Sequence, residues 1–120
     1  MSQKKKILIV DDERLVARTL ELKLAKDGHL TTAVFNGLEA LEELAKREYD
    51  LVLLDIIMPE IDGWEVLAKF QERKHPGKII IISNLCQPED ISKAKALGAH
   101  DYFVKTDVTL EEIAERVDRL

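Results

Sequence analysis

The sequence has few residues that cross-link or interrupt a chain. Among 120 residues there are one cysteine, three prolines and five glycines, and nowhere do prolines and glycines gather into a linker. The single thiol, Cys86, cannot form an intramolecular disulfide, which agrees with a reducing compartment. We expect an inert, half-buried thiol and a single domain over residues 1–120.

Long hydrophobic runs and an excess of positive charge are also absent. Only four apolar residues, 7–10, follow the basic start before Asp11, which is too short for a signal-peptide core or a membrane span. Acidic residues outnumber basic ones by 23 to 18, giving a net charge of -5, and this balance argues against a nucleic-acid backbone as a direct partner. We therefore expect a cytoplasmic protein with no membrane or direct nucleic-acid contact.

Short apolar runs alternate along the chain with amphipathic segments. Residues 51–54 form a continuous apolar run, typical of a strand buried on both faces, whereas Thr31 and Thr32 make another strand polar enough for a sheet edge. This alternation predicts a doubly wound α/β fold, with a five-stranded parallel sheet between two helical layers. We expect the flavodoxin-like strand order 2-1-3-4-5, in which the first and third strands flank the ligand crevice. We expect strands at about residues 6–10, 30–34, 50–54, 78–83 and 101–104, and helices at about 13–27, 37–47, 63–74, 88–97 and 109–120.

Terminal signals and apolar spacing support these helices. Asn36 and Thr109 each precede a glutamate by three positions, which predicts capping at two helix starts, and Pro88 followed by two acids predicts a third. In the helix near residues 37–47 we expect the leucines at helical spacing, including Leu38, to face the core.

Polar residues follow four of the apolar runs. Asp11 and Asp12 follow the first strand, Asp55 the third, Ser83 the fourth and Lys105 the fifth. Because ligands of such sheets bind at the carboxyl ends of the strands, we expect these side chains around one crevice. Three close carboxylates predict raised or coupled pKa values unless a cation lies among them. Oxygen ligands alone favour Mg²⁺, Mn²⁺ or Ca²⁺, and we expect Mg²⁺.

The carboxylate on the central strand is the natural nucleophile of such a site. Asp55 would form an acyl phosphate, stabilised by the metal ion and by Lys105. The ordered pattern closely resembles the receiver domain of two-component response regulators, a chemotaxis-regulator-like domain, over essentially the whole chain. The residues that carry the resemblance are Asp11-Asp12, Asp55, Met58-Pro59, Asp62-Gly63, Ser83 and Lys105.

The resemblance implies a chemistry for the acidic residues. Asp55 would take a phosphoryl group from a histidine kinase, a histidine phosphotransfer protein or a small phosphodonor. Mg²⁺, with Mn²⁺ as a second candidate, would be bound by Asp11, Asp12, Asp55 and the backbone carbonyl of Ile57.

The resemblance also implies a conformational response. Ser83 would turn toward the phosphoryl group and Tyr102 would turn inward behind it. The surface made by the fourth helix, fifth strand and fifth helix would then change its contacts with a downstream protein or effector domain. The charges on the last helix would suit a homodimer through this surface, but they also fit an ordinary solvated helix.

Several residues depart from the usual pattern. Thr106 stands where proline usually follows the lysine, so we expect a trans Lys105-Thr106 bond and a lysine that reaches the site less well. Asn84 would narrow the entry to the site. Ile57 and Leu85 are apolar where polar side chains often position water, which predicts slow loss of the phosphoryl group.

Other interpretations of the same residues remain open. Taken singly, Asp12 fits a helix cap, Ser83 a loop hydroxyl, Lys105 a surface lysine and Tyr102 a core aromatic. A scaffold of the same fold that does not use phosphate is one alternative. A Mg²⁺-dependent phosphohydrolase is a remote one, because Ile57 stands where its general acid would be, so we expect no turnover of a separate substrate.

Two further classes are disfavoured by the residues themselves. A nucleotide- or flavin-binding protein would need a loop rich in glycine or hydroxyl groups after the first strand, and residues 11–14 are charged instead. The three histidines have no spacing that suggests a transition-metal site, and we expect them in surface loops. These residues are His29, His75 and His100.

Overall fold

Within residues 4–120 ten elements alternate, strand and then helix, as the sequence pattern predicts. The computed structural model describes residues 4–120, so the first three residues of the expected domain lie outside it. The strands are β1 (Lys6–Val10), β2 (Leu30–Val34), β3 (Leu51–Leu54), β4 (Lys78–Ser83) and β5 (Asp101–Val104), and the helices are α1 (Arg14–Lys26), α2 (Gly37–Lys46), α3 (Gly63–Glu72), α4 (Pro88–Ala96) and α5 (Leu110–Asp118).

All five strands are parallel and pair in the order β2-β1-β3-β4-β5, which confirms the predicted doubly wound topology. β2 lies at one edge, as its threonines predict, and β3 lies in the middle with all four residues buried. From β1 the chain proceeds to β2 at one edge of the sheet, and from β3 it proceeds toward the other edge. The ends of β1 and β3 therefore border the crevice where such folds bind ligands.

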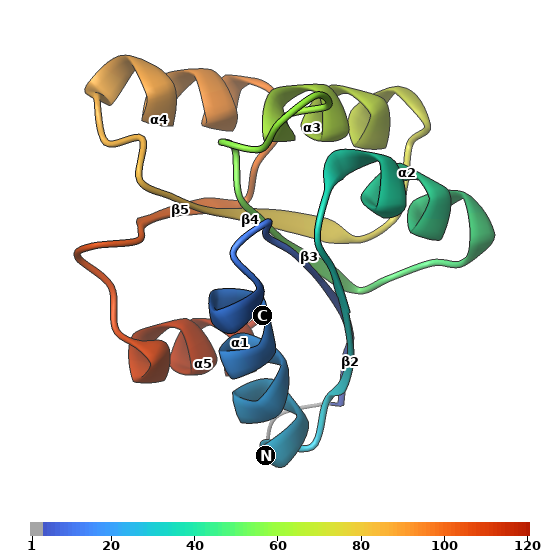
Figure 1. Cartoon of the computed structure of the whole chain (residues 1–120), viewed down its shortest axis with the longest axis vertical. Coiled ribbons are helices and arrows are strands. Elements are labelled where there is room, and N and C mark those ends of the chain that lie inside the picture. Colours follow the sequence, from blue (N-terminus) through green and yellow to red (C-terminus); the bar gives the residue numbers. More distant parts are fainter. Residues whose placement is uncertain (1–3) are drawn as a thin grey trace.

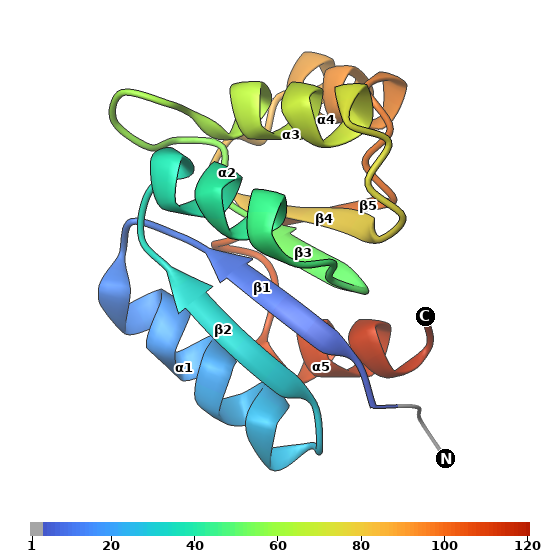
Figure 2. The same ribbon diagram turned by 90° about the vertical axis from the view of Figure 1, so that its right-hand side faces the viewer.

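Helices cover both faces of the sheet (Figures 1 and 2). Alternate residues of each strand point to opposite faces, and β1 shows the consequence. Its Leu8 and Val10 belong to a core cluster with α2, α3 and α4, whereas Ile7 and Ile9 belong to a second cluster with α1 and α5. The second cluster anchors α5 beside α1, and the first places α3 next to α4.

The predicted helix signals are present with one exception. Asn36 accepts a hydrogen bond from the backbone N–H of Glu39 at 2.8 Å, and Thr109 forms a full capping box with Glu112. Pro88 occupies the first turn of α4. The interpretation of Asp12 as a cap is wrong, because Glu13 is the N-cap residue of α1 and its side chain makes no capping bond.

Close backbone packing explains why Leu38 is exposed and not in the core. A Cβ on Gly37 would lie 2.3 Å from the backbone oxygen of Ile61, so α2 sits with this glycine against the β3–α3 loop. One residue further round the helix, Leu38 points outward with 57% of its surface exposed, and Ala40 takes the buried position.

Two surface assignments also change. Cys86 is exposed and not half-buried, because it lies in the loop between β4 and α4. His29 is buried, with 4% of its surface exposed, and joins two distant segments. Its Nδ1 accepts a hydrogen bond from the backbone N–H of Lys5, and its Nε2 lies 3.1 Å from Asp118 on α5.

Candidate functional site

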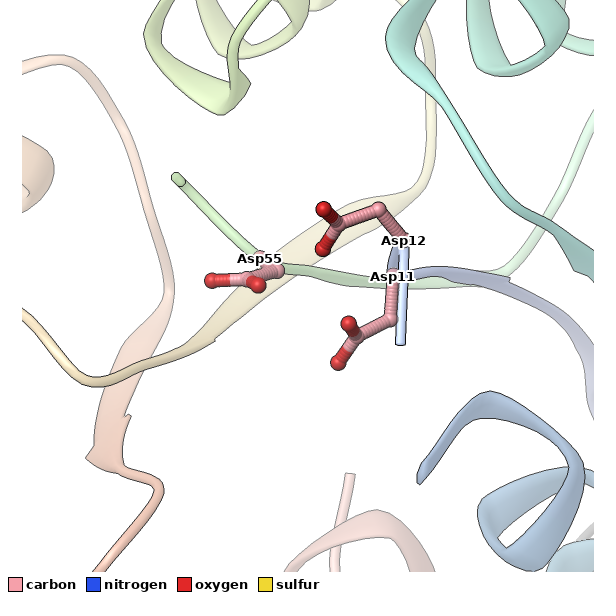
Figure 3. Close-up of side chains that lie close together, drawn as sticks. All are labelled: Asp11, Asp12 and Asp55. Carbon is pink, nitrogen blue, oxygen red and sulfur yellow. The ribbon is translucent and has the colours of Figure 1, made fainter. Parts of the chain in front are cut away.

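Three aspartates meet where β1 and β3 end. Asp11 and Asp55 each follow a buried strand, and the pairing of Val10 with Leu54 brings them side by side. Both are buried, whereas Asp12 is exposed. One carboxylate oxygen from each residue lies within 4.8 Å of the other two. Figure 3 shows the three side chains projecting to the same side of the strand ends.

The backbone fixes the orientation of the two buried carboxylates in the same way. Asp11 Oδ1 accepts a hydrogen bond from the N–H of Glu13 at 2.9 Å, and Asp55 Oδ1 accepts one from the N–H of Ile57 at 3.3 Å. In both residues Oδ2 is the oxygen that faces Lys105. The local chain therefore holds one oxygen of each acid and directs the other into the site.

The ammonium of Lys105 contacts the two buried aspartates of this cluster. Its Nζ lies 2.8 Å from Asp11 Oδ2, 3.1 Å from Asp55 Oδ2 and 3.5 Å from Glu13 Oε2, and only 10% of its side chain is exposed. Residues 4–120 contain no cis peptide bond, which confirms the trans bond before Thr106.

The expectation that this trans bond would weaken the reach of Lys105 is wrong. The backbone N–H of Lys105 donates to the carbonyl of Ser83 at 2.8 Å and so extends the pairing of β5 with β4. The sheet thus sets the position of Lys105, upstream of the bond to Thr106.

The surroundings of Asp11 and Lys105 raise the pKa values of both groups. Burial raises the pKa of Asp11 above its ordinary value, and the charge of Asp55 adds to this, although the hydrogen bonds from Lys105 and Glu13 oppose it. Burial alone would lower the pKa of Lys105, but its hydrogen bond to Asp11 and the charges of Asp55 and Asp11 raise it. The raised pKa of Asp11 therefore comes mainly from burial, whereas the raised pKa of Lys105 comes from the two carboxylates beside its ammonium.

The donor set fits a hard divalent cation. All three candidate ligands are carboxylates, which suit Mg²⁺ or Mn²⁺ rather than a thiophilic metal. Metal–oxygen distances of about 2.0–2.6 Å put ligand oxygens up to about 5 Å apart, and the aspartate oxygens satisfy this spacing. Ile57 lies beside Asp55 through its N–H bond. The role of the Ile57 carbonyl stays a prediction.

Ser83 and Tyr102 converge on the loop that follows β4. Ser83 is fully buried and its Oγ accepts a hydrogen bond from the N–H of Leu85, while the Tyr102 hydroxyl donates to the Leu85 carbonyl at 2.6 Å. Burial raises the pKa of Tyr102, the charge of Asp90 adds to this, and a hydrogen bond with Ser83 opposes it. Tyr102 is partly buried and packs against the cluster under α2, α3 and α4.

The start of α3 touches the back of Asp55. The N–H of Gly63 donates to the carbonyl of Ile56 at 2.8 Å, and a Cβ on Gly63 would lie 2.3 Å from the backbone oxygen of Asp55. The next residue, Trp64, packs against the core, and the ammonium of Lys93 on α4 lies 4.2 Å from its ring centroid. From the sequence, Gly63 was only one of the residues that carry the resemblance, and this contact with Asp55 was not predicted.

Reasoning from the sequence also missed the contact between Glu13 and Lys105. The available signal was a third acidic residue directly after Asp11 and Asp12. Its side-chain direction depends on the start of α1, which the sequence places only to within a residue or two.

Fold and site together define a doubly wound α/β protein with an acidic cation site and a buried lysine at the carboxyl edge of its sheet. A family model described as the response regulator receiver domain matches residues 7–118. The chain belongs to the receiver-domain family of response regulators, the signalling domains of two-component systems. Domains of this family are signalling modules rather than turnover enzymes, and they bind Mg²⁺ at an acidic pocket.

Relatives of known sequence agree with this assignment. The chain is 35% identical over 115 residues to the uncharacterized transcriptional regulatory protein YkoG of Bacillus subtilis (strain 168), covering 96% of this chain and 50% of the relative. It is 33% identical over 100 residues to the transcriptional regulatory protein PcoR of Escherichia coli, covering 83% and 44%. The chain thus spans about half the length of these relatives.

Solved structures show the same fold. The receiver domain of a Francisella response regulator superimposes with a TM-score of 0.91 at 29% identity, covering 97% of this chain and 95% of that one. The response regulator TrrA of Thermotoga maritima, in complex with Mg²⁺ and BeF, gives a TM-score of 0.83 at 35% identity, covering 96% and 97%. No helix within residues 4–120 is both long and apolar enough to cross a membrane.

Proposed function

We propose that Asp55 is the phosphoacceptor of this domain, with Mg²⁺ bound by Asp11, Asp12, Asp55 and the backbone carbonyl of Ile57. The observation that carries the proposal is the position of Lys105, whose ammonium lies 3.1 Å from Asp55 Oδ2 at the edge of the carboxylate group. Asp55 is a buried acid with the ammonium of Lys105 beside it, and the neighbouring aspartates would hold Mg²⁺. Positive charge on both sides suits Asp55 to receive an anionic phosphoryl group.

In this reaction a carboxylate oxygen of Asp55 attacks the phosphorus of a phosphohistidine or a small phosphodonor. The new O–P bond forms as the donor's N–P or O–P bond breaks, and the leaving group takes up a proton from solvent. Bound Mg²⁺ would neutralise charge on the phosphoryl oxygens. Lys105 donates to a phosphoryl oxygen, and the hydrogen bond from the Ile57 N–H keeps Asp55 oriented during the transfer.

The signal then passes to Ser83 and Tyr102. Both side chains bond the backbone of Leu85, so a turn of the Ser83 hydroxyl toward the phosphoryl group removes one of the two bonds that hold the β4–α4 loop. The hydrogen bond from the Tyr102 hydroxyl to the carbonyl of Leu85 in this loop supports its role as the switch residue. The surface of α4, β5 and α5 changes its partners as a result.

The partners follow from this chemistry. The phosphoryl donor is a histidine kinase or a histidine phosphotransfer protein of the cytoplasm, and the receiver of the signal is a downstream protein or an effector domain. A homodimer through α4, β5 and α5 is a second arrangement of the same surface. Mn²⁺ is the second candidate ion for the same site, because both ions accept carboxylate ligands.

Two other functions would use the same fold. A scaffold that does not depend on phosphate would retain the α4, β5 and α5 surface without any adduct on Asp55. A phosphohydrolase would need a general acid where Ile57 places a half-exposed apolar side chain.

Intact-mass measurement separates these functions. The protein is incubated with Mg²⁺ and acetyl phosphate or phosphoramidate, and we expect one added phosphoryl group that is absent from Asp55→Ala. Asp107→Ala, which removes an exposed aspartate after β5, is the matched control and should keep the adduct. A wild-type protein that never gains the group would support the scaffold, and continuous release of phosphate from a phosphomonoester would support the hydrolase.

A further inference from the structure

Glu13 has a side chain that serves no local purpose in its helix. It is the N-cap residue of α1, yet its carboxylate makes no capping bond, and its backbone N–H already holds Asp11. The carboxylate instead lies 3.5 Å from Lys105 Nζ, with about half of the side chain exposed. Glu13 is therefore the most exposed of the three acids that Lys105 contacts.

The three contacts of Lys105 differ in what else they must do. The oxygens of Asp11 and Asp55 that face Lys105 belong to the two buried acids of the cation site. A divalent cation held by these acids repels the ammonium and competes for the same oxygens. Lys105 is nine-tenths buried, and a buried ammonium without an anionic partner is strongly unfavourable. Glu13 is the remaining acidic partner of Lys105, since it does not belong to the cluster of Asp11, Asp12 and Asp55 that could hold the cation.

We propose that Glu13 is a positioning residue that holds Lys105 when Mg²⁺ is bound and no phosphoryl group is present. This inference rests on the proposed function, because it concerns how Lys105 is made ready for the phosphoryl group. When that group arrives, Lys105 leaves Glu13 for a phosphoryl oxygen. The strength of the Glu13 contact thereby sets how easily metal displaces the lysine and how easily the phosphoryl group recruits it.

The two consequences have opposite signs. Without the Glu13 carboxylate, the ammonium of Lys105 has no other acid to contact when the metal ion displaces it, so Mg²⁺ binding weakens. Once Mg²⁺ is saturating, Lys105 has no competing anion outside the site, so transfer to Asp55 becomes faster. Damage to the start of α1 would instead weaken both steps, which separates positioning from a structural role.

The first test measures Mg²⁺ binding and does not require phosphorylation. The rise of the unfolding midpoint with Mg²⁺ concentration gives the dissociation constant for the wild type and for Glu13→Gln. We expect an increase of about two- to five-fold, the range of a part-exposed ion pair. Glu60→Gln is the control for loss of one charge near the same edge, because Glu60 is exposed in the loop between β3 and α3. Glu13→Asp keeps the charge and should restore most of the affinity.

The same pair of substitutions in a Lys105→Met background isolates the contact. There, Glu13→Gln should weaken Mg²⁺ binding no more than Glu60→Gln does, because no ammonium is left to hold. An equal effect of Glu13→Gln with and without Lys105 would overturn the proposal, since it would reduce Glu13 to a distant charge.

The second test is the rate of Asp55 phosphorylation by phosphoramidate at saturating Mg²⁺. Glu13→Gln should react faster than both the wild type and Glu60→Gln, and a slower reaction would overturn the proposal. If no variant gains a phosphoryl group, the proposed function fails, whereas the Mg²⁺ measurements still decide the role of Glu13.

Discussion

Lys105 Nζ lies 3.1 Å from Asp55 Oδ2, although the two residues are 50 positions apart in the chain. The contact joins the ends of β3 and β5, which are separated in the sheet by β4. The oxygens that face Lys105 belong to two of the three aspartates that could hold a divalent cation, so the lysine and such a cation would compete for the same acids. The predictions below follow from this competition and from the packing around it.

Removal of the ammonium should destabilise the metal-free protein. In Lys105→Met, Asp11 and Asp55 lose their shared cation, and we expect the free energy of unfolding to fall by about 1–3 kcal/mol without Mg²⁺. Added Mg²⁺ should stabilise this variant more than the wild type. Urea unfolding with and without Mg²⁺ measures both effects, and Lys95→Met, an exposed lysine of α4, is the control. Unchanged stability would show that the acids do not need the lysine.

Asp11→Asn should stabilise the metal-free protein near neutral pH. The pKa of Asp11 in the folded state is raised above 3.8, so the folded protein binds this proton more tightly than the unfolded chain. The resulting stability is present below pH 3.8 and is lost as the pH rises through the raised pKa. Asparagine resembles the protonated acid and avoids this loss. Urea midpoints over a pH series should show an advantage that shrinks toward acid, together with a lost response to Mg²⁺.

Tyr102→Phe should loosen the β4–α4 loop while leaving phosphorylation of Asp55 intact. The substitution removes the bond from the Tyr102 hydroxyl to Leu85, and a lost hydrogen bond of this kind costs about 0.5–1.5 kcal/mol. Hydrogen exchange at residues 84–87 should become faster, with the mass shift on Asp55 retained. Tyr49→Phe removes another partly buried hydroxyl contact, to Glu43, and should leave this loop unchanged. A lost adduct in Tyr102→Phe would place the tyrosine in the chemistry instead.

Gly63→Ala should disturb Asp55 from behind. The added Cβ would lie 2.3 Å from the backbone oxygen of Asp55 and 2.6 Å from Ile56 Cα, and backbone atoms cannot move aside cheaply. We expect a loss of about 1–3 kcal/mol in the free energy of unfolding, typical of overpacking, and weaker Mg²⁺ binding. Thermal unfolding with a Mg²⁺ titration measures both. Ser92→Ala, at an exposed position of α4, should change neither.

Ile57→Asn should shorten the lifetime of the phosphorylated protein. The isoleucine side chain is 53% exposed beside Asp55, where an amide would hold a water molecule close to the phosphoryl group. Loss of the mass adduct over time gives the rate, with Leu38→Asn as the control at another exposed apolar position. Equal rates for the wild type and Ile57→Asn would contradict the idea that apolar flanks slow hydrolysis.

The strand ends explain why the grouping of these side chains at one edge was predictable. A parallel sheet directs every carboxyl end to one edge, so Asp11, Asp55, Ser83 and Lys105 could be grouped from the ends of apolar runs alone. The order of the strands was expected because it is common among doubly wound folds. These features depend on periodicity and chain direction, which the sequence carries directly.

The remaining features depend on contacts between elements. Leu38 is exposed because Gly37 packs against Ile61, and His29 is buried because Lys5 and Asp118 bond its ring. Neither contact follows from the spacing within a single helix or strand. The reach of Lys105 was underestimated for the same reason, since its backbone is held by the neighbouring strand.

Trp64, the only tryptophan in the chain, follows the glycine of α3 that touches Asp55, and the ammonium of Lys93 on α4 lies over its ring. Its indole emission therefore comes from a single place and needs no added dye. A shift of α4 relative to α3 would move that ammonium across the ring and change the brightness or colour of the fluorescence. Trp64 is thus an intrinsic fluorescence probe of helix movement, which can be followed in real time as ions or phosphodonors are added.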